Sequence, residues 1–201
     1  MILSIDTTSG SGSIALTEAN VVIEELALDA PEGFGHVLFG HIQHLLDKNG
    51  TTVHQMECFA AASGPGSFTG VRVGLAVVKG LAEATGKRVV AVSNLRALAF
   101  FGAAPLRATV IDARRGEVYA AVYNSRLELV MPEVVVKLDT WLPTLPTNDC
   151  ELISTVSAPR ALAAAIGHIA WDEFTAGRSS DPAGIDANYV RRSDAELFWK
   201  E

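Results

Sequence analysis

The sequence is poor in cysteine, with only Cys58 and Cys150 among 201 residues. Two cysteines are too few for a disulfide framework or a zinc site. The chain is therefore neither a disulfide-rich nor a zinc-stabilised small domain. Cys58 lies in an apolar run and is interpreted as a small buried hydrophobic residue. No apolar stretch is long enough to cross a membrane, and no charged leader precedes the first apolar run, which Asp6 interrupts. We therefore expect no signal peptide, no membrane partner and a cytoplasmic location.

Charge is also scarce, and its balance is acidic. Charged residues make up 19% of the chain, and 23 acidic residues against 16 Lys and Arg give a net charge of −7. No run of Lys or Arg is longer than two, whereas a protein that grips a nucleic-acid backbone usually carries a basic patch. This pattern predicts that the chain alone does not bind nucleic acid. The hydrophobic fraction of 49% is ample for a core and argues against disorder.

The most informative stretch is Ser63–Gly74, with the sequence SGPGSFTGVRVG. An apolar run of strand length, Cys58–Ala62, precedes it, and apolar residues at helical spacing follow from Val71. A strand, a glycine-rich turn and a helix are therefore expected here, with Ser67 or Thr69 as the N-cap. A turn of this kind aims backbone N–H groups and the positive end of the helix at one point, which suits an anion.

Three interpretations of this helix stay open. Its apolar face includes two glycines one turn apart, Gly70 and Gly74, where another backbone can approach closely. That backbone belongs either to the chain's own sheet or to another protein. The third interpretation is a phosphate cradle, although no Lys-Ser or Lys-Thr follows the second glycine as in a Walker loop. The residues of this face are Gly70, Val73, Gly74, Val77, Val78 and Leu81.

The remaining pattern predicts an α/β chain with two lobes. The first three strands form a β-meander, a helix from Phe34 to Asn49 follows, and Gly102–Pro105 is the boundary between lobes 1–102 and 103–201. The strands are expected at Met1–Asp6, Ser13–Leu16, Val21–Leu28, Arg88–Val92, Ala108–Ile111, Glu117–Tyr123 and Val134–Val136, and two further helices at Asn94–Phe101 and Ala158–Ala170.

Constellations that carry chemistry are sparse. His41 and His44 lie three residues apart on the predicted first helix, but no carboxylate stands at a matching spacing, so no metal site is expected. No His accompanies Ser67 or Ser93 in a pattern that indicates a nucleophile and its base, which leaves no protease constellation.

Four stretches together resemble the TsaB (YeaZ) family. The stretch Ser63–Gly74 is the most specific, and Ile111–Tyr119 (IDARRGEVY) is the next. Ile2–Thr8 (ILSIDTT) and Asn188–Glu196 (NYVRRSDAE) are also similar to the family. The four come in family order and span almost the whole chain. Members of this family are dimerisation subunits of the bacterial tRNA threonylcarbamoyladenosine system.

The resemblance implies an actin-like ATPase fold, shared with sugar kinases and heat-shock chaperones, in which the second lobe is reduced. In that superfamily the aspartate after the first strand and a hairpin of the second lobe face a nucleotide phosphate and its metal. Carried over to this sequence, the resemblance implies a vestigial nucleotide cleft at Asp6, Thr8, Ser67, Asp112 and Arg114. The residues by themselves also fit plain strand-ending turns, with a local Asp112–Arg114 pair that contributes little.

The resemblance also implies a subunit that binds rather than catalyses. Its partner is the catalytic subunit TsaD, and together with the small ATPase TsaE the complex transfers a threonylcarbamoyl group to N6 of adenosine 37 in tRNAs that read ANN codons. The tRNA is then reached only through the complex. No cofactor is required by this chain, while weak ATP or ADP binding at the lobe cleft or a subunit interface stays open. The implied partner interface comprises Leu38, Ile42, Leu45, Gly70, Val73, Gly74, Val77, Val78 and Leu81.

Two alternatives remain beside this expectation. The first is an ATPase or small-molecule kinase that acts on its own through Asp6, Asp112 and the helix start at Ser67. Such enzymes need a carboxylate base and a metal–phosphate clamp, of which only fragments are visible. The second is a homodimer through the same helices, because an exposed apolar helix face seeks cover.

Overall fold

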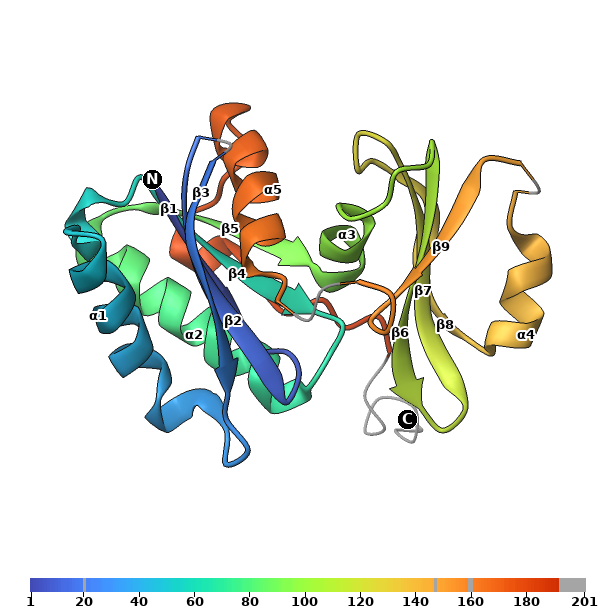
Figure 1. The fold of residues 1–201 in the computed structure, drawn as a ribbon, viewed down its shortest axis with the longest axis horizontal. Coiled ribbons are helices and arrows are strands. Elements are labelled where there is room, and N and C mark those ends of the chain that lie inside the picture. Colours follow the sequence, from blue (N-terminus) through green and yellow to red (C-terminus); the bar gives the residue numbers. More distant parts are fainter. Residues whose placement is uncertain (20, 147, 159–160, 192–201) are drawn as a thin grey trace, which may run out of the picture.

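A computed structural model of the chain describes residues 1–19, 21–146, 148–158 and 161–191. The chain forms two sheets that lie side by side, each with helices against it (Figure 1). The last part of the Asn188–Glu196 motif, from residue 192 onward, lies outside the described residues. Within the described residues, no helix is both long and apolar enough to cross a membrane.

The first sheet has five strands in the order β3-β2-β1-β4-β5. Its first three strands pair antiparallel, which confirms the predicted β-meander, and β1, β4 and β5 pair in parallel. The strands are β1 (Ile2–Asp6), β2 (Ser11–Glu18), β3 (Val21–Asp29), β4 (Cys58–Gly64) and β5 (Arg88–Ser93).

Helices cover both faces of this sheet, so its central strands are buried on both sides. The side chains of Leu3 and Ile5 pack against the helices α1 (Leu38–Lys48) and α2 (Phe68–Thr85). Ile2, the residue before Leu3, points to the opposite face and packs against α5 (Ala163–Thr175). This alternation follows from the two-residue period of a strand and explains why the β1 and β4 sequences are apolar throughout.

The packing of α5 corrects the predicted extent of the second lobe. This helix was expected at Ala158–Ala170 within a second lobe of residues 103–201, but it begins at Ala163 and packs on the first sheet. Ser13 on β2 fixes its start, because the Ser13 Oγ accepts hydrogen bonds from the N–H groups of Leu162 and Ala163 at 3.1 and 3.0 Å. The chain therefore returns to the first lobe after the second sheet is complete.

The second sheet has four strands in the order β8-β7-β6-β9. The predicted hairpin is confirmed as the pair β6 and β7, and the short helix α3 packs between this sheet and the first lobe. The strands are β6 (Leu106–Arg114), β7 (Glu117–Asn124), β8 (Leu129–Val136) and β9 (Cys150–Ser154). The helices are α3 (Asn94–Ala99) and α4 (Leu138–Trp141), with short 3-10 turns at Phe34–His36, Val53–Gln55, Leu142–Thr144 and Pro182–Gly184.

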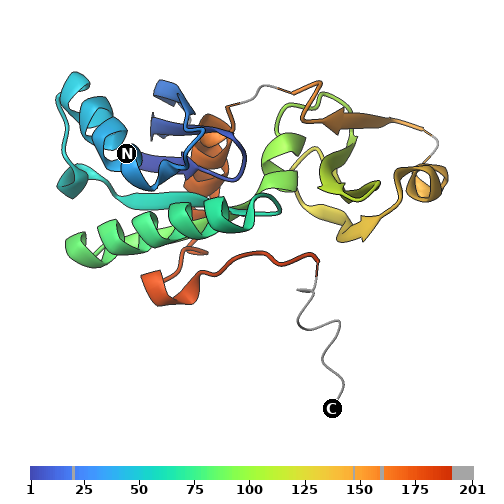
Figure 2. The same cartoon turned by 90° about the horizontal axis from the view of Figure 1, so that it is seen from below.

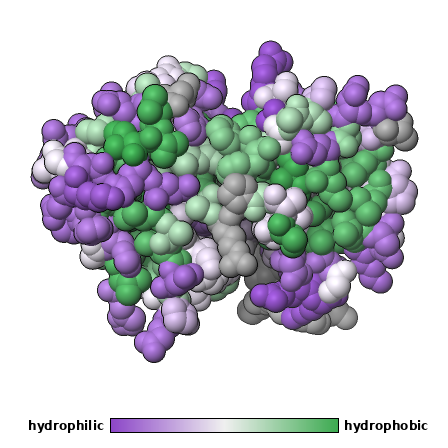
Figure 3. Space-filling view, in the orientation of Figure 1, coloured by the Kyte–Doolittle hydropathy of each residue, from purple (hydrophilic) through white to green (hydrophobic). Residues whose placement is uncertain are grey.

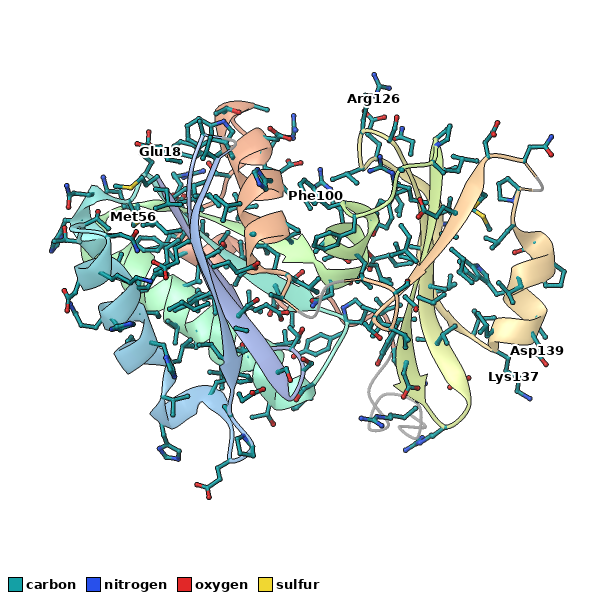
Figure 4. All side chains as sticks on the ribbon, in the orientation of Figure 1. Glu18, Met56, Phe100, Arg126, Lys137 and Asp139 are labelled. Carbon is teal, nitrogen blue, oxygen red and sulfur yellow. The ribbon has the colours of Figure 1, made fainter. Side chains whose placement is uncertain are left out.

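Contacts between the two lobes converge on Glu133 of β8. Its carboxylate accepts hydrogen bonds from the hydroxyls of Ser93, at the end of β5, and Tyr123, and from the side-chain amide of Asn188 at 2.6 Å. Asn188 belongs to the segment after α5, which runs along α2 toward the second lobe (Figure 2). Within the first lobe, Phe100, just after α3, stacks on His168 of α5, with ring centroids 5.2 Å apart (Figure 4).

The start of α2 packs directly against the turn that follows β1. A Cβ atom at Gly70 would lie 1.9 Å from the carbonyl oxygen of Thr7, so only glycine fits this position. The Thr7 hydroxyl also donates a hydrogen bond of 2.7 Å to the carbonyl of Gly70. Between the open interpretations of the glycine face, the structure favours the chain's own sheet as the partner of Gly70.

Gly70→Ala should destabilise the protein by about 3 kcal/mol, because the added methyl group meets backbone rather than a movable side chain. Gly80→Ala is the matched control on the same helix, since nothing lies within 4 Å of a Cβ built there. That variant should be about 1 kcal/mol more stable than the parent, from helix propensity alone. Urea unfolding measures both, and equal effects of the two substitutions would contradict the close contact.

Candidate functional site

A cleft of about 730 Å³ opens between the two lobes. Its walls come from the turn after β1, the glycine-rich turn between β4 and α2, the start of α3, and the β6–β7 hairpin. All five residues predicted for a nucleotide cleft line it, namely Asp6, Thr8, Ser67, Asp112 and Arg114. Residues more than one hundred positions apart in the sequence are thus brought to one site.

Asp6 is the most deeply buried charged group of the cleft, with 2% of its surface exposed. Its Oδ1 accepts hydrogen bonds from the backbone N–H of Thr8 at 2.9 Å and from the Thr8 hydroxyl at 2.6 Å. Burial raises the pKa of this carboxyl above the ordinary value, and the hydrogen bonds from Thr8 offset the rise only in part. Asp6 is therefore a carboxylate that the fold holds in place at an energetic cost.

Asn94, the first residue of α3, is a cleft residue that sequence reasoning missed. Its side-chain amide donates to the Thr8 hydroxyl at 2.6 Å, and its oxygen accepts from the N–H of Gly64 at 3.0 Å. It thereby joins the ends of β1 and β4 from the neighbouring helix. In the sequence, Asn94 is only a polar residue that follows the predicted helix cap Ser93. Nothing in that local pattern indicates that its side chain is buried and bonded at the ends of two strands.

Of the two predicted N-caps, Ser67 and Thr69, it is Ser67 that caps α2, and its Oγ accepts a hydrogen bond from the N–H of Gly70 at 3.3 Å. Its own N–H donates to the carbonyl of Thr8 at 2.6 Å. These bonds join the turn after β1 to the start of α2 along one wall of the cleft. The positive end of the α2 helix dipole consequently lies at the cleft, where it favours a negative group.

The opposite wall is the tip of the β6–β7 hairpin. Oδ1 of Asp112 accepts from the N–H of Arg114 at 2.8 Å, and the two side chains form an ion pair of 3.7 Å. Both side chains are exposed, at 66% and 88%, so this pair contributes little to stability. It keeps one carboxylate and one guanidinium at the mouth of the cleft.

The cleft is lined by polar groups, of which Asp6 and Asp112 are the two carboxylates. Both carboxylates already accept hydrogen bonds from their own turns. In the described part of the chain, no three His, Cys, Asp or Glu side chains come together as metal ligands do. Hydroxyls, backbone N–H groups and Arg114 remain as the groups that face a ligand.

The predicted partner interface is corrected by burial. Six of its residues lie inside the chain's own core and are not available to another protein: Leu38, Ile42, Leu45, Gly70, Gly74 and Val78. Gly74 resembles Gly70 in that a Cβ there would lie 2.7 Å from the Thr7 hydroxyl, so a larger residue would disturb the fold as well as any pairing. Val73, Val77 and Leu81 are half-buried at the edge of that core.

The exposed side of α2 carries a different set of small residues. Ala76, Gly80 and Ala84 are exposed at helical spacing beside Val77 and Leu81. Together, Val73, Ala76, Val77, Gly80, Leu81 and Ala84 form a continuous line along the helix, called the α2 stripe below. The sequence showed the helical spacing of the apolar residues in α2. It did not show which of two overlapping faces of this helix is buried in the core and which is exposed.

Comparison with known proteins decides the family. The family model for TsaD, the tRNA N6-adenosine threonylcarbamoyltransferase, matches residues 31–167. The tRNA threonylcarbamoyladenosine biosynthesis protein TsaB of Bacillus subtilis is 35% identical over 153 residues, which cover 74% of this chain and 67% of the relative. The chain belongs to the TsaB (YeaZ) family.

Further relatives agree with this membership. TsaB of Escherichia coli is 36% identical over 61% of this chain, a match that spans 54% of the relative, so the shared region is about half of that protein. The solved structure of YeaZ from Pseudomonas aeruginosa is 25% identical and superposes with a TM-score of 0.77 over 94% of this chain and 98% of its own. The two-lobed actin-like fold implied by the family resemblance is confirmed.

Asp6→Asn should stabilise the protein at neutral pH, because the buried carboxylate loses its charge while Oδ1 still accepts from Thr8. The pKa is raised in the folded state, so the native protein holds this proton more tightly than the unfolded chain does. The contribution of Asp6 to stability is therefore largest below the ordinary pKa of 3.8 and falls as the pH rises through the raised value. The variant should gain about 1 kcal/mol at pH 8 and almost nothing at pH 4.

Urea unfolding of parent and variant at both pH values measures this difference, and comparing the pair cancels the other titrating groups. A gain that grew toward acidic pH would show that Asp6 is stabilised as a charge and not penalised.

Proposed function

We propose that this chain is a non-catalytic subunit of the machinery that makes threonylcarbamoyladenosine in tRNA, and that it works in the cytoplasm by binding the catalytic subunit TsaD. The threonylcarbamoyl group then goes to N6 of adenosine 37 in ANN-decoding tRNAs, with TsaE as the ATPase of the complex. Family membership supports the pathway, because the curated relatives carry this biosynthesis in their names. The α2 stripe is the single observation that supports binding to a partner.

The stripe is suited to helix-on-helix contact because its exposed residues Ala76, Gly80 and Ala84 are small and leave the backbone accessible. Nothing lies within 4 Å of a Cβ at Gly80, so a facing helix can approach the backbone closely there. Apolar surface alone does not single out this site, since apolar side chains also gather over the second lobe on the face shown in Figure 3. The stripe differs from that surface in lying on a regular helix of 18 residues.

The cleft supports a binding role over an enzymatic one. A phosphotransferase needs a carboxylate free to act as a base and groups that clamp metal and phosphate. Here Asp6 is buried under Thr8, and Asp112 is engaged by Arg114. TsaD is then the subunit that carries the reaction.

Gly80→Arg should weaken binding to TsaD at least about tenfold and reduce threonylcarbamoyl transfer in the reconstituted system by a similar factor, because a long charged side chain blocks the stripe. The fold should be unaffected, since the position is open. Ser125→Arg is the matched control, an exposed residue between β7 and β8 on the second lobe. Co-purification with TsaD from the same organism, calorimetry and the transfer assay give the three readouts.

If the Gly80→Arg variant bound TsaD with unchanged affinity, the α2 stripe would not be the interface. Absence of any complex between the parent chain and TsaD would remove the proposed function itself. Sizing of the chain alone shows whether the stripe also pairs two copies, in which case Gly80→Arg should yield a monomer.

A second candidate function is weak ATP or ADP binding in the cleft between the lobes. It is favoured by the meeting of Thr8, Ser67 and Arg114 around one cavity at a helix start. Calorimetry with Mg-ATP tests it, and Thr8→Val should abolish binding because it removes the hydroxyl between Asp6 and Asn94. ATP hydrolysis by the chain alone, lost in Asp6→Ala, would instead support an independent ATPase or kinase.

A further inference from the structure

A second groove, of about 600 Å³, lies on the other side of the Pro65–Gly66 turn from the cleft. One wall is the first turn of α2 with Phe68 and Arg72, and the other is the tip of the β6–β7 hairpin. The segment from Ala187 to Arg191 completes it. This segment is anchored from both lobes, because the N–H of Asn188 donates to the carbonyl of Ser63 at 2.8 Å and its side chain donates to Glu133.

The lining of this groove is rich in arginine, unlike the acidic chain as a whole. Four arginines and no acidic residue are among the described residues that line it, although the chain as a whole carries a net charge of −7. The four are Arg72, Arg114, Arg115 and Arg191. They come from three separate parts of the sequence, so the search for basic runs did not predict them as one cluster. Arg191 donates to the Glu117 carboxylate at 2.6 Å, and Arg114 pairs with Asp112 at 3.7 Å. Arg72 is therefore the guanidinium of the groove that best matches the oxygens of a phosphate.

Aromatic rings accompany these arginines. Phe68 and Tyr189 are both more than half exposed, with ring centroids 6.1 Å apart, and Tyr119 also lines the groove. The guanidinium of Arg72 lies 3.7 Å above the Phe68 ring, and its Nε donates to the Tyr189 hydroxyl at 3.1 Å. Among the described residues, the two terminal nitrogens of Arg72 have no hydrogen-bond acceptor. The side chain is thus held in position by its neighbours while its outer N–H groups face the solvent.

The two arginines at the hairpin tip have left-handed backbone conformations, which are unfavourable for residues other than glycine. Arg114 and Arg115 have positive φ angles of 64° and 57°, and Gly116 follows at 75°. Glycine or asparagine is the usual residue for such positions, since an ordinary side chain costs about 1 kcal/mol there. A tip that keeps long cationic side chains in spite of this cost is consistent with a role for those side chains in binding.

We propose that this arginine groove binds a nucleoside phosphate, with the phosphate on the arginines and the base against the Phe68–Tyr189 rings. Stacking on aromatic side chains beside cationic groups is how proteins hold single nucleotides of flexible strands. A free mononucleotide and one nucleotide of an RNA strand share this chemistry. The inference stands on the groove alone and does not depend on a complex with TsaD.

The test measures binding of the full chain to two probes at low salt. One is a fluorescein-labelled RNA of eight nucleotides followed by anisotropy, and the other is AMP followed by calorimetry and used as a competitor. RNA binding that AMP does not displace identifies an RNA strand as the ligand, and displacement by AMP identifies a free nucleotide. Both results support the groove, provided that Arg72→Met weakens binding about tenfold, as loss of a charge-assisted contact should. Binding should also weaken as salt is raised.

Arg126→Met is the matched control. Arg126 is an exposed arginine paired with Glu128 at the far end of the second lobe, and its replacement should leave binding unchanged (Figure 4). Phe68→Leu should weaken binding several-fold by removing the stacking surface while keeping an apolar side chain. Thr8→Val separates the groove from the cleft, since Thr8 lines only the cleft. No binding of either probe, equal binding by Arg72→Met and parent, or loss of binding in Thr8→Val alone would overturn the proposal.

Discussion

The close approach of the turn after β1 to the first turn of α2 is the contact on which the rest of this structure depends. The carbonyl of Thr7 occupies the space that a side chain at Gly70 would need. The Thr7 hydroxyl donates a hydrogen bond to the carbonyl of Gly70. The two segments are therefore packed backbone against backbone, with no side chain between them. This contact brings the end of β1 and the start of α2 to one edge of the first sheet, where the second lobe meets them.

The cleft at that edge contains Asp6, a buried carboxyl at the end of β1. Asp6 is buried among hydrogen-bond donors but has no cation beside it in the described part of the chain, so its charge is penalised at neutral pH. A protein selected only for stability would place a neutral residue here. The hydrogen bonds from Thr8 and the contact of Asn94 with Thr8 hold this acid in place despite the cost.

The molecule presents three distinct surfaces around this framework, each with its own chemistry. The cleft combines hydroxyls with a helix start, the α2 stripe offers small apolar residues on a regular helix, and the arginine groove concentrates positive charge on an acidic chain. The cleft and the groove share the Pro65–Gly66 turn as a wall, and Arg114 reaches both. A ligand in the cleft is therefore expected to affect binding in the groove, and the reverse. Both sites lie at the N-terminal end of α2, the helix that carries the stripe.

The sequence by itself determined the β-meander, the strand, turn and helix around the glycine-rich stretch, and an N-cap at Ser67 or Thr69, because these follow from local periodicity and turn chemistry. The family and the five residues of the cleft came from its motifs and the resemblance that they carry. The sequence also showed that Gly70 needs a close neighbour, but not which one. Only the tertiary structure decided that the neighbour is Thr7, that α5 belongs to the first sheet, and that arginines distant in sequence form a groove. Those outcomes depend on contacts between segments far apart along the chain, which no local pattern of residues encodes.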